Sequence, residues 1–335
     1  MLPHACDADA NRLNSGHRMR WPFSFGPRQQ DISGRSVSDY KKGILALLAA
    51  NLIWGFAPIL YRALDHVRAD ETLAHRTIWS FLFFAIFIAF QGRSRELAGL
   101  ATNKALRGRI LLAAVLIAAN WGIFIYAIVI GQALQAGFAY YIFPIIAVAF
   151  GVLLFKERMQ PAQWLAIAIV IVAVATFGAA NGAVPYLALV LAVTFALYGI
   201  VKRGIGVGPV MSVTAETGAV TLLGVGWLIW LHFMTAGGIA FGQDWYDSLL
   251  LILSGPLTGG PMILFSYAAA RLNYAELGLI QYMNPTLQTF VAVMLFAEPF
   301  SPIHALALGL IWIALAIYSV AAFRAVRAVP KVPMT

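Results

Sequence analysis

Three ionisable residues, His75, Arg76 and Glu216, lie inside long apolar runs of this 335-residue sequence. A charged side chain in hydrocarbon is costly, so residues of this kind mark binding sites or ion pathways by default. The ordinary imidazole pKa near 6.5 suits His75 to proton exchange, although a histidine that hydrogen-bonds a neighbouring helix need never titrate. We therefore predict that these three residues gate a pathway or couple it to protons.

Arg76 and Glu216 are not expected to pair with each other. Their runs start on opposite faces of the membrane, so their depths differ by on the order of 15 Å in a core of roughly 30 Å. This depth difference predicts that they lie at opposite mouths of a pathway. Two alternatives remain open: Arg76 extends its aliphatic stem to the headgroups, or Glu216 pairs with Lys202 or Arg203.

Two prolines, Pro144 and Pro285, each lie about ten residues into an apolar run, near the bilayer midplane. A proline inside a helix leaves the carbonyl four residues earlier without its partner, here the carbonyls of Tyr140 and Gln281. Freed carbonyls at this depth suit a polar ligand. The alternative is a helix kink that only shapes packing.

Amide and aromatic side chains are predicted at similar depth on several runs. Polar groups in lipid face the bundle interior, because unsatisfied donors in hydrocarbon cost several kcal/mol. Hydrogen bonding between helices or ordinary packing explains any one of them alone. Together with Tyr140 and Gln281 they outline a cavity for a small amphipathic molecule: Asn51, Trp54, Asn120, Trp121, Tyr141, Thr194, Tyr198, Tyr267 and Tyr282.

The segment between the first two runs holds Asp65, His66, Asp70 and Glu71 without a recognised metal-ligand spacing. A solvated loop is the favoured interpretation, and neither a metal nor a cofactor is expected. The motifs G-x-x-x-x-G-K-S/T, H-E-x-x-H and G-x-S-x-G are absent. The sequence therefore gives no sign of nucleotide hydrolysis or of these hydrolase chemistries.

The elements that must position these residues are membrane-spanning helices. Hydrophobic residues make up 61% of the chain and charged residues 11%, against roughly 45–50% and about 25% in soluble domains. A span needs about 20 apolar residues. Ten runs meet this requirement: 43–62, 73–91, 110–130, 134–155, 162–180, 184–201, 211–233, 248–270, 274–297 and 303–323.

The basic residues set the orientation of these runs. If both termini are cytosolic, 20 of the 23 Lys and Arg residues fall in cytosolic segments, as the positive-inside rule expects. The net charge of +9 is therefore an orientation signal, and no nucleic-acid partner is expected. The expected partners are the lipid bilayer and a small-molecule substrate.

The chain contains an internal repeat. Shifting it by 141 positions matches 124–175 to 265–316 with 15 identities in 52 positions, including Pro144 with Pro285 and Glu157 with Glu298. Both glutamates end a run, where the helix dipole disfavours a carboxylate, so we expect them to cap neighbouring helices. Because each repeat has five spans, the second must insert in the opposite direction, as in many secondary transporters.

Several strings resemble a known family: IWGFAP (Ile53–Pro58), ADETLAHRTIWS (Ala69–Ser80), NWGIFIYA (Asn120–Ala127), YYIFP, FKER and QYMNP (Gln281–Pro285). Over residues 41–325 they are similar to RarD-type permeases, in the EamA group of the drug/metabolite transporter superfamily. The resemblance implies a ten-helix permease of the bacterial inner membrane, often labelled a chloramphenicol-resistance permease.

The sequence thus predicts an all-α membrane protein of two inverted five-helix repeats, 41–181 and 182–325. A disordered cytosolic tail (1–40) and a short cytosolic tail (326–335) flank them. The expected activity is secondary transport of a small amphipathic metabolite or drug by alternating access, with possible proton coupling. The alternatives are a membrane enzyme acting on lipid near His66 and a scaffold that does not transport.

Overall fold

The computed structural model describes residues 37–155, 161–182, 184–203, 205–235, 238–272, 277 and 280–327. Regular structure in these residues is helical. The helices are α1 (Val37–Ala63), α2 (Ala69–Phe90), α3 (Ser94–Thr102), α4 (Lys104–Val129), α5 (Ala133–Phe155), α6 (Pro161–Asn181), α7 (Tyr186–Arg203), α8 (Pro209–Met234), α9 (Trp245–Ala269), α11 (Met283–Phe290), the π-helix η2 (Val291–Leu295) and α12 (Pro302–Arg327).

Each of the ten predicted runs overlaps at least one of these helices. Within the described ranges, five helices are long and apolar enough to span a membrane: α1, α2, α4, α8 and α9. Shorter apolar helices lie at Ala133–Ala147, Trp164–Ala179, Tyr186–Lys202 and Pro302–Tyr318. The all-helical membrane class is confirmed, and the count of ten spans stays a prediction. The helix α3 was not predicted, because its nine residues are too few to span a bilayer.

The prediction for the ninth run was wrong in one respect. Pro285 does not lie ten residues into one continuous helix, because α11 begins at Met283, after a turn at Tyr282. Pro285 therefore occupies the first turn of α11, where a missing N–H costs little. Pro144, in contrast, lies inside α5, as predicted.

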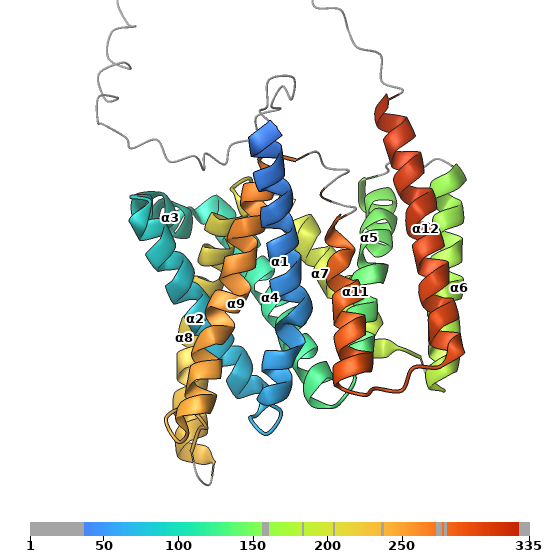
Figure 1. Cartoon of the computed structure of the whole chain (residues 1–335). Helices are drawn as coiled ribbons and strands as arrows, with labels where there is room; N and C mark the ends of the chain where they lie inside the picture. The colour runs from blue at the N-terminus through green and yellow to red at the C-terminus, as the bar shows by residue number, and fades with distance from the viewer. Residues whose placement is uncertain are drawn as a thin grey trace, which may run out of the picture.

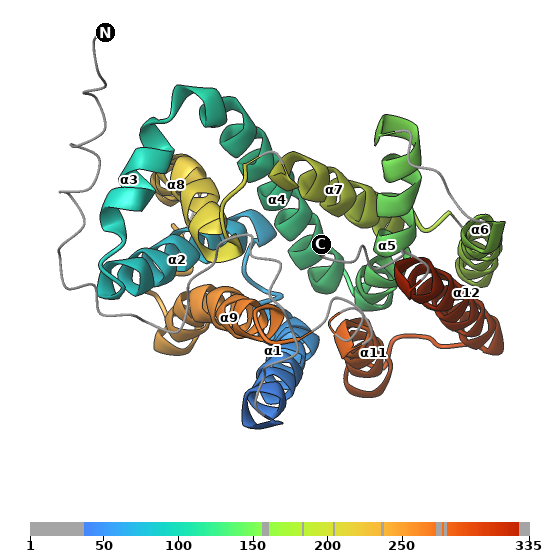
Figure 2. The same cartoon turned by 90° about the horizontal axis from the view of Figure 1, so that it is seen from above.

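The helices form an elongated bundle (Figures 1 and 2). At one edge α6 packs on α12, and at the other α2 packs on α8 and α9. Between these edges α1 packs on α9 and α11, and α7 packs on α4 and α5. The start of α1 and the end of α12 lie at the same end of the bundle (Figure 1). The loops from α1 to α2 and from α4 to α5 lie at the other end.

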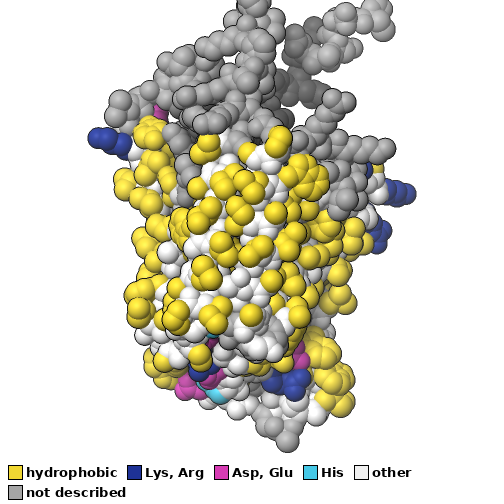
Figure 3. All heavy atoms as spheres, turned by 90° about the vertical axis from the view of Figure 1, so that its right-hand side faces the viewer, with side chains coloured by type: hydrophobic (Ala, Val, Ile, Leu, Met, Phe, Trp, Pro, Cys, Tyr) yellow, Lys and Arg dark blue, Asp and Glu magenta, His cyan; other side chains and the backbone are white. Residues whose placement is uncertain are grey.

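The face made by α6 and α12 is apolar over its middle, and charged side chains gather near its two ends (Figure 3). Large hydrophobic side chains are exposed there: Trp164, Leu165, Ile171 and Val172 on α6, and Ile303, Leu306, Trp312 and Ile313 on α12. Exposed apolar surface of this extent suits contact with lipid.

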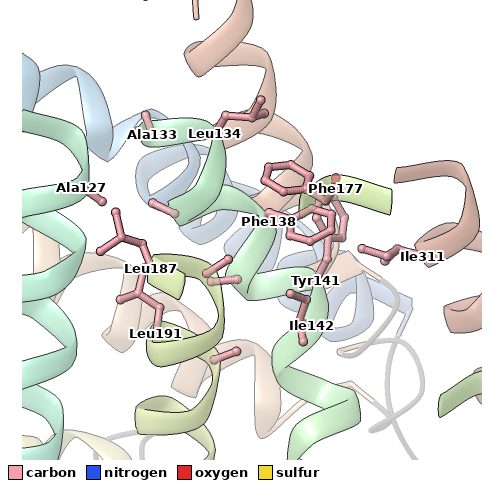
Figure 4. Packing of buried hydrophobic residues seen from close by; sticks show 14 of the residues in the cluster. Ala127, Ala133, Leu134, Phe138, Tyr141, Ile142, Phe177, Leu187, Leu191 and Ile311 are labelled. Carbon is pink, nitrogen blue, oxygen red and sulfur yellow. The ribbon is translucent and has the colours of Figure 1, made fainter. Parts of the chain in front are cut away.

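The main buried cluster lies around α5 (Figure 4). Phe138 of α5 stacks on Phe177 of α6 with ring centroids 3.9 Å apart. Leu187 and Leu191 of α7 fill another part of the same cluster. The helix α5 therefore joins the α6–α12 pair to the rest of the bundle.

Close contact between α2 and α9 depends on Gly255 and Gly259. A Cβ atom at Gly255 would lie 2.4 Å from the carbonyl carbon of Trp79, and one at Gly259 would lie 2.4 Å from the Phe83 ring. The two glycines form a GxxxG motif, which lets helix backbones approach closely. This approach brings Thr258, between them, next to α2.

Candidate functional site

Arg76 is the centre of the candidate site. Only 8% of this α2 residue is exposed. Its guanidinium carbon lies 4.3 Å from the ring centroid of Trp121 on α4 and 5.3 Å from that of Tyr61 on α1. Its Nε donates to Thr258 Oγ1 on α9 at 3.1 Å. Because the side chain lies between aromatic rings inside the bundle, it does not extend to the headgroups.

The charge on Arg76 has no carboxylate partner among the described residues. Its Nη1 atom is buried and donates to no hydrogen-bond acceptor there. Each aspartate and glutamate in the described ranges has another interaction: Asp39, Asp65, Asp70, Glu71, Glu96, Glu216, Asp244, Asp247 and Glu298. A guanidinium stays protonated, so a positive charge is buried with aromatic faces as its main compensation.

Five aromatic rings connect this site to a second polar cluster, and we call them the aromatic row: Tyr61, Phe124, Tyr140, Phe195 and Tyr198. Consecutive ring centroids lie 6.2, 5.9, 6.0 and 5.9 Å apart. The rings come from α1, α4, α5 and α7. Tyr140 is also within electrostatic reach of the Arg76 guanidinium.

Glu216 of α8 is the centre of the second cluster and is fully buried. Tyr198 donates a hydrogen bond to its Oε2 at 2.8 Å, and Ser212 donates one to its Oε1. Lys202 Nζ lies 3.4 Å from Oε1 and also donates to the Tyr198 hydroxyl. The open alternative in which Glu216 pairs with Lys202 is therefore the observed one.

As expected, Arg76 and Glu216 do not form an ion pair with each other, since each has the other partners described above. His75, next to Arg76, is buried and stacks on Phe241 with ring centroids 4.7 Å apart. Its Nε2 has no hydrogen-bond partner within the described ranges. A role for His75 in proton coupling stays a prediction.

Asn120 links two helices, because its Nδ2 donates to Leu191 O and to Thr194 Oγ1 of α7, both at 2.9 Å. Asn51 instead donates to Leu47 O of its own helix, and its buried Oδ1 has no partner in the described part of the chain. Both amides are buried, as predicted for polar groups in lipid.

The remaining predicted aromatic residues lie away from Arg76. Trp54 contacts Phe265 with centroids 6.2 Å apart, and the Arg271 guanidinium lies 3.4 Å from the Tyr267 ring centroid. Neither contact involves the aromatic row. Trp54 thus contacts α9, and Tyr267 of α9 contacts Arg271, which lies just beyond the end of that helix.

Tyr141 and Tyr282 meet at the junction of α5, α11 and α12. Both rings contact Trp312, with centroids 6.0 and 6.3 Å apart. The Thr286 hydroxyl donates to Tyr282 O at 2.7 Å, so in its 2.9 Å bond with Tyr141 the tyrosine is the donor. Figure 4 places Tyr141 beside Phe177, within the α5 cluster. The partly buried Gln281 precedes the turn at Tyr282.

The charged side chains of the loop between α1 and α2 form pairs. His66 Nε2 lies 2.8 Å from Asp247 Oδ2, and Arg68 binds Asp70 at 2.7 Å. The hydrogen bonds to Asp70 raise the pKa of Arg68 further above its usual value. No group of three metal-ligating residues occurs within the described ranges.

Glu298 caps a neighbouring helix, as predicted. Its two carboxylate oxygens accept the backbone N–H groups of Ala133 and Leu134, at 2.6 and 2.7 Å, at the start of α5. Burial is the main cause that raises the pKa of Glu298 above its usual value. Its repeat counterpart, Glu157, lies outside the described residues.

Sequence reasoning missed Tyr61, Thr258, Phe124 and Phe195. Two signals were available. Tyr61 follows Trp54 by seven positions, so both lie on one helix face, and Thr258 lies inside the GxxxG motif of an apolar helix. The phenylalanines carried no signal, because nothing in composition separates a ring of the aromatic row from any other ring in the core.

The fold and this site define a multi-pass membrane protein with a buried, positively charged aromatic centre. Residues 41–178 match the EamA-like transporter family. An uncharacterized transporter of Vibrio cholerae is 36% identical over 287 residues, which are 86% of this chain and 95% of that protein. Protein RarD of Escherichia coli is 34% identical over 279 residues, which are 83% of this chain and 94% of that protein.

The chain belongs to the EamA-like transporter family, as a RarD-type permease of the drug/metabolite transporter superfamily. The family resemblance of the sequence motifs is thereby confirmed. A solved crystal structure covers 87% of this chain and 99% of its own with a TM-score of 0.57. At 19% identity, this likeness is one of fold alone.

Proposed function

We propose that the chain is a secondary transporter that moves a small amphipathic molecule across the bacterial inner membrane by alternating access. Its two halves, 41–181 and 182–325, would be inverted repeats with cytosolic termini. The observation that carries the proposal is the buried Arg76 at the contact between the halves. Tyr61 and Trp121 belong to the first half, and Thr258 belongs to the second. Substrate sites at the contact between repeats are typical of such transporters.

The helix contacts support a mechanism in which the two halves exchange conformations. Under the repeat, α1 corresponds to α7, α2 to α8, α4 to α9, α5 to α11 and α6 to α12. The contact of α1 with α9 then corresponds to that of α7 with α4, and α2 with α9 corresponds to α8 with α4. The contacts α2–α8, α5–α11 and α6–α12 correspond to themselves. Such symmetry lets one half adopt the conformation of the other.

Cysteine labelling tests the inversion. The single native cysteine, Cys6, is replaced by serine, and single cysteines are placed in equivalent loops by His66→Cys and Val207→Cys. An impermeant thiol reagent should reach the first only from outside the cell and the second only from the cytosol. Labelling of both from the same side would contradict the inversion.

Metabolite profiling tests transport itself. Cells lacking the chain receive the wild type, Arg76→Gln or the matched control Arg95→Gln, in which an exposed α3 arginine changes identically. At least one small molecule should change its distribution between cells and medium with the wild type and the control, but not with Arg76→Gln. Identical profiles for wild type and empty cells would refute the function.

Proton coupling is the finer part of the proposal and rests on Glu216 and His75. Once a substrate is found, its flux into proteoliposomes is measured with and without an imposed pH gradient. We expect the gradient to drive accumulation in the wild type and not in Glu216→Gln. Intact transport that ignores the gradient would remove the coupling and leave the transporter.

A further inference from the structure

The deepest unexplained feature of the molecule is the incomplete pairing of Arg76. Burying an ion is costly even after the surroundings relax, and a desolvated cation–π contact returns less than this cost. Trp121 and Tyr61 therefore offset only part of the cost. An anion at the guanidinium would supply the remainder.

The free edge of the guanidinium has a definite shape. Its Nε is used by Thr258, which in turn donates to Ser254 O at 2.9 Å. The buried Nη1 has no partner among the described residues. The edge formed by the two Nη atoms is thus left for an acceptor, and its parallel N–H groups match the two oxygens of a carboxylate.

The charge of the ligand follows from the charges nearby. Arg76 contributes a single positive charge, and Lys202, at the far end of the aromatic row, is already paired with Glu216. A dianion such as a phosphate monoester would bring one negative charge that no described cation near Arg76 balances. The site therefore suits a monoanion.

The body of the ligand follows from the aromatic row. The row starts at Tyr61, against the guanidinium, and continues through Phe124 and Tyr140. Aromatic faces and edges favour contact with other rings beyond the gain from burying apolar area. A hydrophilic acid would gain nothing from them.

We propose that Arg76 binds the carboxylate of a monoanionic substrate whose aromatic body lies against the aromatic row. This inference rests on the transport function proposed above and names its substrate class. It explains why the side chain keeps a charge in a place where an apolar residue would pack more cheaply.

Binding is tested by thermal stability of the purified full-length protein in detergent. Samples are heated to a series of temperatures, and size-exclusion chromatography gives the fraction that stays monodisperse at each one. The probes share one ring and differ in charge: phenylacetate, phenylacetamide and phenethylamine. Acetate tests the body, and phenyl phosphate tests the charge. Of these probes, phenylacetate alone should raise the temperature at which half of the protein stays monodisperse. The rise should be about 3 °C or more at a near-saturating concentration. Equal shifts from all probes, no shift from any, or a larger shift from another probe would overturn the proposal.

The variants locate the binding. Arg76→Gln should abolish the phenylacetate shift, Arg76→Lys should keep a smaller one, and Arg95→Gln should keep it whole. A shift that persists in Arg76→Gln would place the anion elsewhere and refute the proposal. If Arg76→Gln does not yield monodisperse protein, Arg76→Lys decides. An ammonium cannot bind both oxygens in a fork, so a phenylacetate shift as large as that of the wild type would refute the proposal.

The two proposals fail separately. If the transported substrate is neutral or cationic, the carboxylate proposal is refuted and the transport function stands. Phenylacetate binding that depends on Arg76, with no transported metabolite, would remove the transport function and leave the site.

Discussion

Arg76 and Glu216 occupy the same position in two helices that pack against each other. Each follows the first residue of its helix, Ala69 in α2 and Pro209 in α8, by seven positions. The two helices run in opposite directions (Figure 1), so each residue lies about 10 Å from a different end of the bundle. Opposite charges thus stand at corresponding places, and the aromatic row connects them.

Replacing Arg76 by methionine should separate stability from function. Removing a buried, incompletely paired charge in favour of an apolar side chain is neutral or stabilising by about 1–4 kcal/mol. We expect Arg76→Met to unfold in mixed micelles with an apparent free energy at least equal to that of the wild type. The same variant should lack the Arg76-dependent change in metabolite distribution. A strongly destabilised Arg76→Met would mean that the arginine is mainly structural.

Trp121 should matter for stability because it covers the Arg76 guanidinium. Trp121→Leu removes a desolvated cation–π contact and a buried ring, for a combined loss of about 3 kcal/mol or more. The control is Trp164→Leu, on the exposed face of α6, which should change the unfolding free energy by about 0.5 kcal/mol or less. Equal losses of unfolding free energy in the two variants would argue against stabilisation by the Trp121–Arg76 contact. In the Arg76→Met background, Trp121→Leu should cost less unfolding free energy, because no cation–π contact is left to lose.

Gly255 should tolerate no side chain. A Cβ atom there would lie 2.4 Å from the Trp79 backbone, which cannot rotate away. Gly255→Ala should separate α2 from α9, weaken the Arg76–Thr258 hydrogen bond and lower the unfolding free energy by about 1–3 kcal/mol. Gly260→Ala is the matched control on the same helix, because nothing lies within 4 Å of its added Cβ. If the two variants unfold alike, the close approach of the helices is not needed.

Lys202 should contribute to stability mainly by compensating the buried charge of Glu216. Truncating one partner of a buried ion pair costs about 3–5 kcal/mol, because the other charge is left unpaired. Glu216 is fully buried, whereas the Lys202 side chain is 21% exposed. The loss of unfolding free energy in Lys202→Met should therefore lie near the lower end of this range. The double variant Lys202→Met with Glu216→Gln should recover part of the loss. A double variant as unstable as the sum of both single variants would contradict the pairing.

The sequence predicted the helices and the buried polar residues well, because hydropathy and the cost of burial act locally along the chain. The membrane class followed from the apolar runs, and the capping role of Glu298 followed from a carboxylate placed against the helix dipole. That Arg76 and Glu216 do not pair followed from their depths alone.

The contacts between helices could not be predicted in the same way. The cage of Arg76 joins side chains from α1, α2, α4 and α9, and periodicity tells which face of a helix is apolar but not which helix it meets. For this reason Tyr61 and Thr258 were missed. Tyr141 binds Thr286 of α11 through its hydroxyl, and its predicted place beside the ligand stays a prediction. The break at Tyr282 was read as a kink because Pro285 was its only local sign.

Glu298 provides a prediction with a defined pH dependence. Its carboxylate accepts two backbone N–H groups of α5, so Glu298→Gln turns one acceptor into a donor facing a donor and should cost about 1–2 kcal/mol at low ionic strength. Because burial raises its pKa above the usual 4.5, the folded chain holds the proton to higher pH than the unfolded chain. The stability linked to this proton is fully present below about 4.5 and declines as the pH rises through the raised pKa. The wild-type minus Glu298→Gln difference in unfolding free energy should therefore decrease across this window. The control Glu96→Gln, in an exposed pair with Arg93, should leave the profile unchanged, and a difference that grows with pH would contradict the direction of the shift.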